Sequence, residues 1–192
     1  MGVIDQEIYG YAGRSLMGYG HERVDSITVL HKVLELIPPR GRFLEIGSYD
    51  GVTSGWLARR RLNVTFICVD PYRNDVPYPD KEDPHDHAVN WMKNCGKLSN
   101  TILVVCRTDE LMQLGGLGWF DVILIDGDHR HKPSKFDLEL SIDLLADGGI
   151  ILLDDLIKGK GGVEHSVNEV MATEKWTLTP VAGSVSMMKK KI

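Results

Sequence analysis

Residues 43–51 read FLEIGSYDG, an apolar run that reaches Glu45 and then breaks into a loop with two glycines four residues apart. Glycine lets a backbone turn tightly and come close to a ligand, because no Cβ stands in the way. A dinucleotide-binding loop would prefer the spacing G-x-G-x-x-G, whereas this loop reads E-x-G-x-x-x-G. With carboxylates at Glu45 and Asp50, it favours a ligand that carries positive charge over one that carries phosphates.

The rest of the chain alternates between strand and helix patterns. We expect strands at residues 43–47, 64–70, 101–106, 121–126 and 150–155, and two closing strands near 175–179 and 184–189. We expect helices at residues 24–37, 53–61, 87–98, 133–145 and 163–173. Pro38-Pro39 ends the first helix, and Gly148-Gly149 ends the fourth. The alternation predicts an α/β fold with a doubly wound, mostly parallel seven-stranded sheet and a C-terminal antiparallel hairpin.

The composition is that of one globular domain. The 192 residues are 43% hydrophobic and carry a formal net charge of −5, which argues against a dedicated nucleic-acid binder. We therefore expect no nucleic-acid partner, and we interpret the lysines at 189–191 as a solvated tail. Residues 1–23, rich in Gly and Tyr, are expected to form an irregular N-terminal arm before a domain at 24–192. A homodimer could form through this arm.

The cysteines and the apolar runs bear on the compartment. The three cysteines include no C-x-x-C pair; they are Cys68, Cys95 and Cys106. We expect them to be small buried residues in a reducing compartment. The N-terminus lacks a charged stretch followed by an apolar one, and no apolar run approaches the roughly 20 residues that span a bilayer. The sequence therefore predicts a soluble, cytoplasmic protein with no membrane partner.

The second expected strand ends at Asp70, where an acid can accept hydrogen bonds from ribose hydroxyls. The segments FLEIGSYDGVTS and CVDPY resemble the first motif and the acidic second-strand motif of class I S-adenosylmethionine-dependent methyltransferases, over about residues 24–190. The resemblance implies a Rossmann-like methyltransferase fold and S-adenosylmethionine as the cofactor. It implies that Gly47 and Gly51 line the methionine part of the cofactor and that Asp70 holds the ribose; otherwise the two glycines would simply shape a turn.

The same resemblance implies a wider set of cofactor-binding residues. Tyr72 and the pair Thr108-Asp109 would flank the adenine, although Tyr72 could instead pack within its own loop. The full set is Glu45, Gly47, Ser48, Tyr49, Gly51, Asp70, Tyr72, Thr108, Asp109, Asp126 and Asp128.

A second group of acids ends the fourth and fifth expected strands, in VILIDGDHRHKP and IILLDDL. In this fold the two strands are neighbours, so Asp126 should face Asp154 and Asp155 across a short gap. Crowded carboxylates repel one another unless protons or a cation intervene. Oxygen ligands suit Mg²⁺, Mn²⁺ or Ca²⁺ better than zinc. We therefore expect these three residues to bind a divalent cation.

Such a cation would have a use, because methyl transfer to a hydroxyl needs that hydroxyl to lose its proton. A metal lowers the hydroxyl's pKa and fixes its position, and Asp126 with His129 could take part in removing the proton. Residues 125–155 resemble metal-dependent O-methyltransferases that act on small molecules and sugars, catechols or caffeoyl-coenzyme A. This chain has His129 where lysine often stands in that subgroup, and Asp154-Asp155 in place of Asp-Asn.

Other interpretations stay open for the acidic group. Asp128 and Asp155 could cap the segments that follow them. His129 could orient a loop, and Asp126 could contact the amino group of the cofactor with no metal. The chain as a whole could be a metal-independent methyltransferase acting on nitrogen, carbon or oxygen, or a nucleotide-fold binding protein without catalysis. The missing G-x-G-x-x-G weighs against NAD.

The remaining candidates concern the acceptor, which we expect to be a small molecule or sugar. Residues 71–86 form the longest irregular stretch and could act as a lid. His85 and His87 lie at its end, and the sequence offers no third ligand beside them. Glu164 and His165 begin the last expected helix and could either touch the acceptor or cap that helix.

Overall fold

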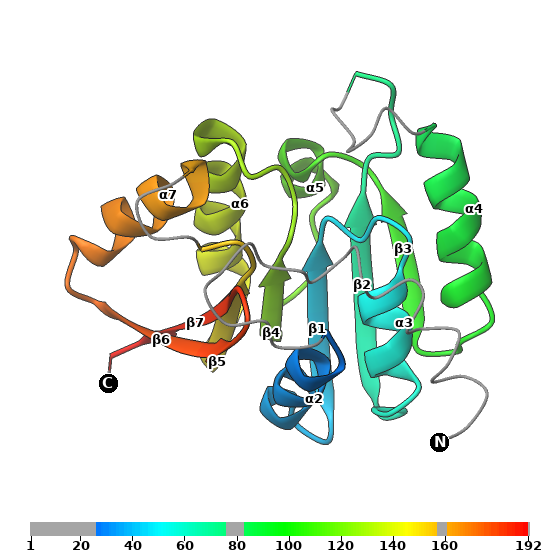
Figure 1. Ribbon diagram of the computed structural model, residues 1–192, viewed down its shortest axis with the longest axis horizontal. Helices are drawn as coiled ribbons and strands as arrows, with labels where there is room; N and C mark the ends of the chain where they lie inside the picture. The colour runs from blue at the N-terminus through cyan, green and yellow to red at the C-terminus, as the bar shows by residue number, and fades with distance from the viewer. Residues whose placement is uncertain (1–25, 76–82, 157–160, 192) are drawn as a thin grey trace.

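The computed structural model describes residues 26–75, 83–156 and 161–191 of the chain (Figure 1). The expected arm at 1–23 lies outside the described residues, as does the 76–82 part of the expected lid. Both expectations therefore remain predictions.

Seven strands form one sheet in the order β3-β2-β1-β4-β5-β7-β6. In chain order they are β1 (Gly41–Ile46), β2 (Val64–Asp70), β3 (Thr101–Val105), β4 (Phe120–Ile125), β5 (Leu145–Leu153), β6 (Trp176–Ala182) and β7 (Val185–Lys190). The first five strands pair in parallel, and β7 pairs antiparallel with both β5 and β6. The predicted doubly wound, mostly parallel sheet with a C-terminal antiparallel hairpin is confirmed.

Helices cover both faces of the sheet (Figure 1). They are α2 (Ser26–Leu36), α3 (Val52–Ala58), α4 (Pro84–Asn94), α5 (Thr108–Leu114), α6 (His131–Leu144) and α7 (Gly162–Met171). On β1, Phe43 packs with Trp56 of α3, whereas its neighbour Leu44 packs with Leu111 of α5 and Leu138 of α6. Successive side chains of a strand point to opposite faces, so strands covered on both faces are apolar throughout. No helix in the described ranges is long and apolar enough to cross a membrane.

Two elements differ from the expectation. Helix α5 follows β3 where the sequence predicted no helix; the carboxylate of Glu110 accepts the backbone N–H of Arg107 at 2.8 Å and so stabilises its first turn. Gly148 and Gly149 do not end α6. That helix ends at Leu144, and both glycines lie inside β5, where the pairing with β4 shifts register. A φ of +78° at Gly148 accommodates this irregularity.

Helix α4 begins at Pro84, three residues before the expected start at His87. The side chain of Asp83 caps it by accepting the backbone N–H of His85 at 2.9 Å. Proline suits the first helical position because its missing N–H would have no partner there. The earlier start places His87 within the helix, packed against the loop after β1.

Candidate active site

The carboxyl ends of β1, β2, β4 and β5 meet at one edge of the sheet, and most of the predicted site residues lie at or just beyond these ends (Figure 1). The strand order reverses between β1 and β4, and ligands of such sheets bind at this switch point. Hydrogen bonds continue past the strands: Gly47 N–H donates to the carbonyl of Val69 at 2.9 Å, and Asp126 N–H to the carbonyl of Ile46 at 2.8 Å. The first residues of both loops are therefore fixed by backbone bonds.

The two glycines of the loop after β1 have structural reasons within the chain. Gly47 has a φ of +87°, and a Cβ there would lie 2.1 Å from the carbonyl oxygen of Asp126. Gly51 has a φ of +69°, and a Cβ there would lie 2.5 Å from Cδ1 of Trp91 in α4. Gly47 thus lets the loops after β1 and β4 touch, and Gly51 lets α4 pack against the first loop. Their contact with a cofactor stays a prediction.

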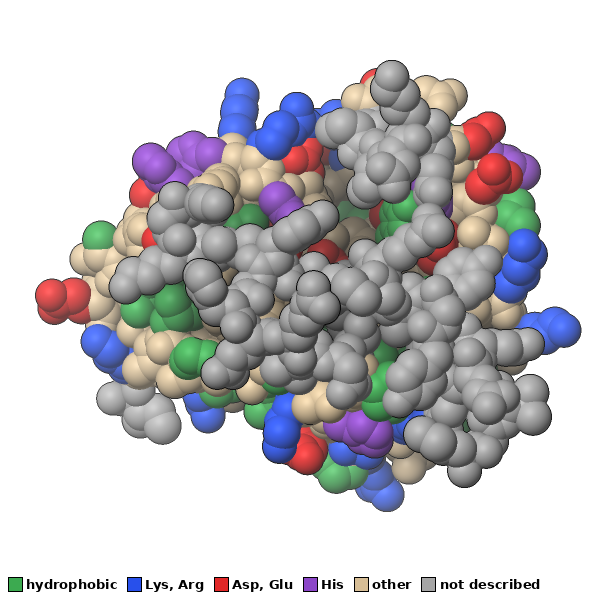
Figure 2. Space-filling view, in the orientation of Figure 1, with side chains coloured by type: hydrophobic (Ala, Val, Ile, Leu, Met, Phe, Trp, Pro, Cys, Tyr) green, Lys and Arg blue, Asp and Glu red, His purple; other side chains and the backbone are tan. Residues whose placement is uncertain are grey.

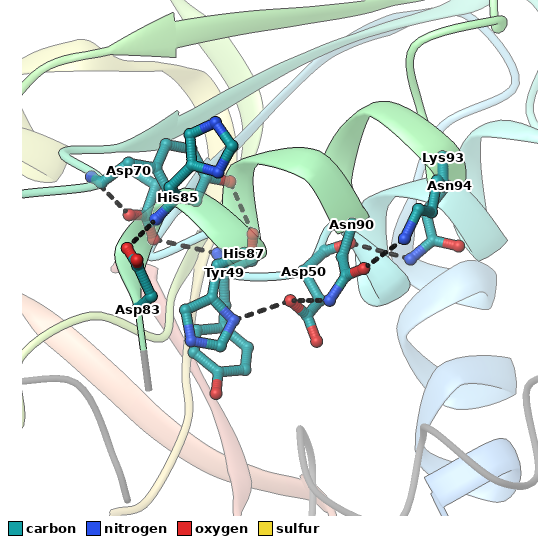
Figure 3. A network of polar contacts seen from close by, with 10 residues as sticks. Tyr49, Asp50, Asp70, Asp83, His85, His87, Asn90, Lys93 and Asn94 are labelled. Atoms are coloured by element: carbon teal, nitrogen blue, oxygen red, sulfur yellow. Dashed lines mark hydrogen bonds and ion pairs between the residues drawn. The ribbon is translucent and has the colours of Figure 1, made fainter. Parts of the chain in front are cut away.

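Asp70 is buried at the end of β2 and joins two loops. Its Oδ2 accepts the backbone N–H of Tyr49 at 2.9 Å (Figure 3). Its Oδ1 accepts the backbone N–H of Tyr72 at 3.1 Å. The hydroxyl of Tyr72 donates to the carbonyl of Tyr49 at 2.5 Å. Both tyrosines have positive φ, 46° and 44°, which is uncommon outside glycine and is concentrated at functional sites. The Asp70 carboxylate thus fixes two backbone turns at the edge of the switch point.

Asp50 binds α4 through its side chain and its backbone. Its Oδ1 lies 2.8 Å from Nδ1 of His87 and 3.3 Å from the side-chain nitrogen of Asn90, and its carbonyl accepts from Asn94 at 2.9 Å (Figure 3). The ring of His87 stacks on that of Tyr49, with centroids 3.9 Å apart. The sequence placed Asp50 beside the cofactor; in the structure its described contacts hold the loop against α4.

Glu45 is fully buried at the end of β1. Its Oε2 accepts a hydrogen bond from the hydroxyl of Ser54, in α3, at 2.5 Å. Burial raises the pKa of Glu45 to about 7; the hydrogen bond from Ser54 opposes this shift, and the charge of Asp70 adds to it. Near neutral pH a substantial fraction of Glu45 is therefore protonated.

Asp126, His129 and Asp155 form one ionic group at the ends of β4 and β5. Nε2 of His129 lies 3.6 Å from Oδ1 of Asp126, and Nδ1 lies 3.2 Å from Oδ2 of Asp155. Asp154 is buried nearby and accepts a hydrogen bond from Ser184, in the turn between β6 and β7. The structure thus brings together the acids that end β4 and β5, with His129 between two of them.

The pKa values in this group reflect crowded negative charge. Burial, and then the charge of Asp154, raise the pKa of Asp126 well above its ordinary value. Burial also raises the pKa of Asp154, to which the charge of Asp155 adds. The carboxylates of Asp126 and then of Asp155 beside its ring raise the pKa of His129 to about 10. At neutral pH His129 is therefore an imidazolium that offsets part of the negative charge.

Three other predicted cofactor residues have partners within the chain. Asp128 accepts both the backbone N–H and Nε of Arg130, at 3.0 and 2.9 Å. Partial burial alone would raise the pKa of Asp128, but the hydrogen bonds and charge of Arg130 outweigh it and lower the pKa. Thr108 begins α5 and hydrogen-bonds a buried carboxylate of α6. Asp109 is exposed and pairs with Arg107 at 3.0 Å. Their roles toward a cofactor stay predictions.

Sequence reasoning missed Ser184 and Ser54 as partners of the site, and it gave His87 another role. Ser184 lies 30 residues from Asp154, and His87 lies 37 residues from Asp50, so no local pattern reports either contact. Ser54 lies nine residues from Glu45. A serine in the first turn of the helix after the loop is a signal that could have identified it.

The residues at this edge of the sheet suit both ligands that the fold implies, a divalent cation and a cofactor with a ribose. Besides burial, the charge of Asp154 raises the pKa of Asp126, and the charge of Asp155 raises that of Asp154. The imidazolium of His129 offsets only part of this negative charge, so the oxygens of the three acids suit a hard divalent cation. A carboxylate has about four acceptor sites, so an oxygen of Asp70 that holds one backbone N–H can accept a further donor such as a ribose hydroxyl.

Comparison with known proteins agrees with this geometry. Residues 44–156, more than half of the chain, match the family described as methyltransferase domain. No curated protein matches the chain in sequence.

Several solved structures are similar to this one. An O-methyltransferase from Bacillus cereus in complex with SAH (S-adenosylhomocysteine) superimposes with a TM-score of 0.62 at 18% identity, over 97% of this chain and 90% of that one. A SAH-bound methyltransferase from Podospora anserina gives 0.66 at 16%, over 100% and 89%. TDP-rhamnose 3′-O-methyltransferase of calicheamicin biosynthesis gives 0.62 at 14%, over 98% and 95%. At these low identities, the similar structures are evidence for the fold alone.

The matched residues run from β1 to just past β5, and so they include Asp70 at the end of β2 and the loops that carry Asp126 and Asp155. The fold of this chain, in which the antiparallel β7 lies between β5 and β6, is similar over nearly the whole chain to the folds of methyltransferase structures. The chain therefore belongs to the methyltransferase domain family and has the Rossmann-like fold of class I S-adenosylmethionine-dependent methyltransferases.

Proposed function

We propose that the protein transfers a methyl group from S-adenosylmethionine to a hydroxyl of a small molecule or sugar, with the assistance of a divalent cation. The observation that carries this proposal is the group of Asp126, His129 and Asp155 at the same strand edge as Asp70. Similar structures include O-methyltransferases, one bound to SAH and one named for TDP-rhamnose, which supports both the cofactor and the acceptor class.

In this proposal the cofactor lies across the ends of β1 and β2. The Asp70 carboxylate accepts hydrogen bonds from the ribose hydroxyls, and the loop of residues 47–51 runs along the methionine part. The two backbone N–H groups on Asp70 fix its orientation before the cofactor arrives. A preorganised acceptor loses less entropy on binding.

The hydroxyl acceptor must give up a proton, and Asp126 and His129 are the candidates to receive it. The pKa of Asp126 is raised, so in the absence of a bound cation its carboxylate is a stronger base than an ordinary one. His129 is protonated as it lies between Asp126 and Asp155, so it can act as a base only after losing that proton. In the ground state its role is to supply positive charge.

Asp126, Asp154 and Asp155 would hold the divalent cation. Bound there, Mg²⁺, Mn²⁺ or Ca²⁺ supplies Lewis-acid chemistry, lowering the pKa of a coordinated hydroxyl and fixing its position. The metal-independent alternative also has an observation in its favour, because the imidazolium of His129 already brings positive charge to these carboxylates.

Two measurements test the proposal. Calorimetry with SAH and with NAD should give binding of SAH and none of NAD, and a protein that binds no SAH would refute the cofactor assignment. Release of SAH from S-adenosylmethionine can then be followed with a panel of hydroxyl acceptors, with and without excess EDTA. Turnover that is unchanged in EDTA would remove the cation from the proposal and leave the methyltransferase.

A further inference from the structure

A second cluster of metal-ligating side chains lies between α6 and α7, outside the group of Asp126, His129 and Asp155. Nε2 of His131 lies 3.2 Å from Oε1 of Glu169, and Nε2 of His165 lies 3.4 Å from the same oxygen. The rings of the two histidines are 4.2 Å apart. Figure 2 shows histidine side chains gathered at the upper left of this face, over the ends of α6 and α7 seen in Figure 1.

The backbone holds these ligands at close range. Gly162 begins α7 and lies against the start of α6, where a Cβ would be 1.9 Å from the backbone nitrogen of His131. One turn further along, the buried hydroxyls of Ser134 and Ser166 are 2.9 Å apart. The Ser166 hydroxyl also lies 3.1 Å from the carbonyl of His131. Contacts made by small and buried residues thus fix the spacing of the two helices, and with it the spacing of the three ligands.

The distances match those within a metal coordination shell. Two ligands each about 2.0–2.1 Å from a tetrahedral zinc ion lie about 3.3 Å from one another, and the two nitrogen–oxygen distances are 3.2 and 3.4 Å. His165 and Glu169 are four residues apart on α7, so they share one helix face. Two imidazoles and one carboxylate suit zinc, cobalt or nickel, whereas magnesium and calcium prefer oxygen ligands.

Lys135 occupies the other oxygen of Glu169 and leaves Oε1 facing the histidines. Its hydrogen bond lowers the pKa of Glu169, which keeps that side chain an anionic ligand. The positive charge of Lys135 also opposes a cation, so it should weaken metal binding.

We propose that His131, at the start of α6, and His165 and Glu169, on one face of α7, bind a divalent transition-metal ion such as Zn²⁺. The site is separate from the oxygen-ligand group of the methyl-transfer proposal and does not depend on it. Helix α6 starts directly after the loop that carries Asp126 and His129. A metal ion that joins α6 to α7 would therefore stabilise α6, the helix that follows this loop.

The test is a zinc titration of the full chain without a polyhistidine tag, in excess Mg²⁺ to occupy any oxygen-ligand site. A chromophoric chelator competes for the zinc, and Co²⁺ in its place reports nitrogen ligation by visible absorption. We expect one zinc per chain and a thermal midpoint raised by about 5–10 °C when free zinc exceeds its dissociation constant about 100-fold. His165→Ala and Glu169→Gln should each weaken binding by more than about tenfold.

Matched controls separate this site from general surface binding. His85 is an exposed histidine on α4. Glu139 is an exposed glutamate on α6 whose Oε1 lies 4.0 Å from Nζ of Lys135. His85→Ala and Glu139→Gln should bind zinc as the wild type does, and Lys135→Gln should bind it about 2- to 5-fold more tightly. Wild-type protein that binds no zinc, or unchanged affinity in both His165→Ala and Glu169→Gln, would overturn the proposal.

Discussion

The imidazole of His87 stacks on the ring of Tyr49 at a centroid distance of 3.9 Å, and the backbone N–H of Tyr49 donates to Asp70 (Figure 3). Nδ1 of His87 also lies 2.8 Å from Asp50. One buried side chain of α4 thus contacts two successive residues of the loop after β1. Through Tyr49 it also supports the carboxylate that we propose to hold the ribose.

His87→Ala should therefore lower both stability and cofactor affinity. The change removes a buried ring and leaves Asp50 with one fewer partner, a loss of about 1–3 kcal/mol in the free energy of unfolding. SAH binding should weaken as well, because Tyr49 loses the ring that packs on it. Urea unfolding and calorimetry give the two numbers. His85→Ala is the control, since His85 is exposed on the same helix; equal effects of the two substitutions would contradict a positioning role for His87.

Asp70→Ala should weaken SAH binding strongly. Losing a hydrogen-bonding partner of a buried polar group costs about 1–3 kcal/mol, or about 5- to 150-fold in the dissociation constant. Part of the loss would come from the backbone N–H groups of Tyr49 and Tyr72, which lose their acceptor. Glu139→Gln, at an exposed position of α6, controls for the loss of a carboxylate. Calorimetry that finds the same affinity for Asp70→Ala as for wild type would show that Asp70 does not hold the cofactor.

Glu45→Gln tests the cost of a buried carboxylate. Burial raises the pKa of Glu45 from 4.5 to about 7, so the protonated form favours the folded state. Its contribution is fully present below about pH 4.5 and is lost as the pH rises through 7, by about 3 kcal/mol in all. Glutamine keeps the shape and the acceptor for Ser54 but does not ionise. The free energy of unfolding should thus fall between pH 5 and pH 8 by more in wild type than in the variant; parallel profiles would mean that Glu45 is not titrating there.

The strands and the site edge could be predicted from the sequence because their signals are local. Short apolar runs mark the five parallel strands, and Asp70, Asp126 and the pair Asp154-Asp155 stand at or directly after the ends of such runs. In a parallel sheet the ends of neighbouring strands share an edge. A correct strand order was therefore enough to bring the acids of β4 and β5 together.

The rest depended on contacts that no local pattern carries. Gly148 and Gly149 have the composition of a helix end, yet pairing with β4 takes them into β5. Helix α5 has seven residues and buries Leu111, so the sequence carries too short an apolar period to predict it. His87 was expected at the end of the irregular stretch, where a helix begins, and its contact with Asp50 was missed because the two residues lie 37 positions apart.

Gly47→Ala should destabilise the protein more than the same change at another glycine of positive φ. The added Cβ would lie 2.1 Å from the carbonyl oxygen of Asp126, so one of the two loops must move. We expect a loss of about 2–4 kcal/mol in the free energy of unfolding. Gly115→Ala is a matched control, since Gly115 has a φ of +59° but nothing within 4 Å of the added atom, and about 1 kcal/mol is expected there. Equal losses in thermal or urea unfolding would mean that the contact between the loops is unimportant.

The titration of His129 tests the ionic group without any knowledge of the acceptor. The neighbouring carboxylates of Asp126 and then of Asp155 raise its pKa from 6.5 to about 10. The stability that this shift contributes is fully present below about pH 6.5 and is lost as the pH rises through 10. In NMR titrations of the imidazole signals, the pKa of His129 should be high in the wild type and should fall toward 6.5 in Asp155→Asn.

Mg²⁺ should lower the pKa of His129 in the same experiment, because a cation bound to Asp126 and Asp155 competes with the imidazolium for their oxygens. The imidazole signals of His85, exposed on α4, provide the control for general effects of salt. If Mg²⁺ does not change the pKa of His129, the imidazolium of His129, and not a bound cation, supplies the positive charge beside these carboxylates. The metal-independent form of the reaction would then be the one that this site supports.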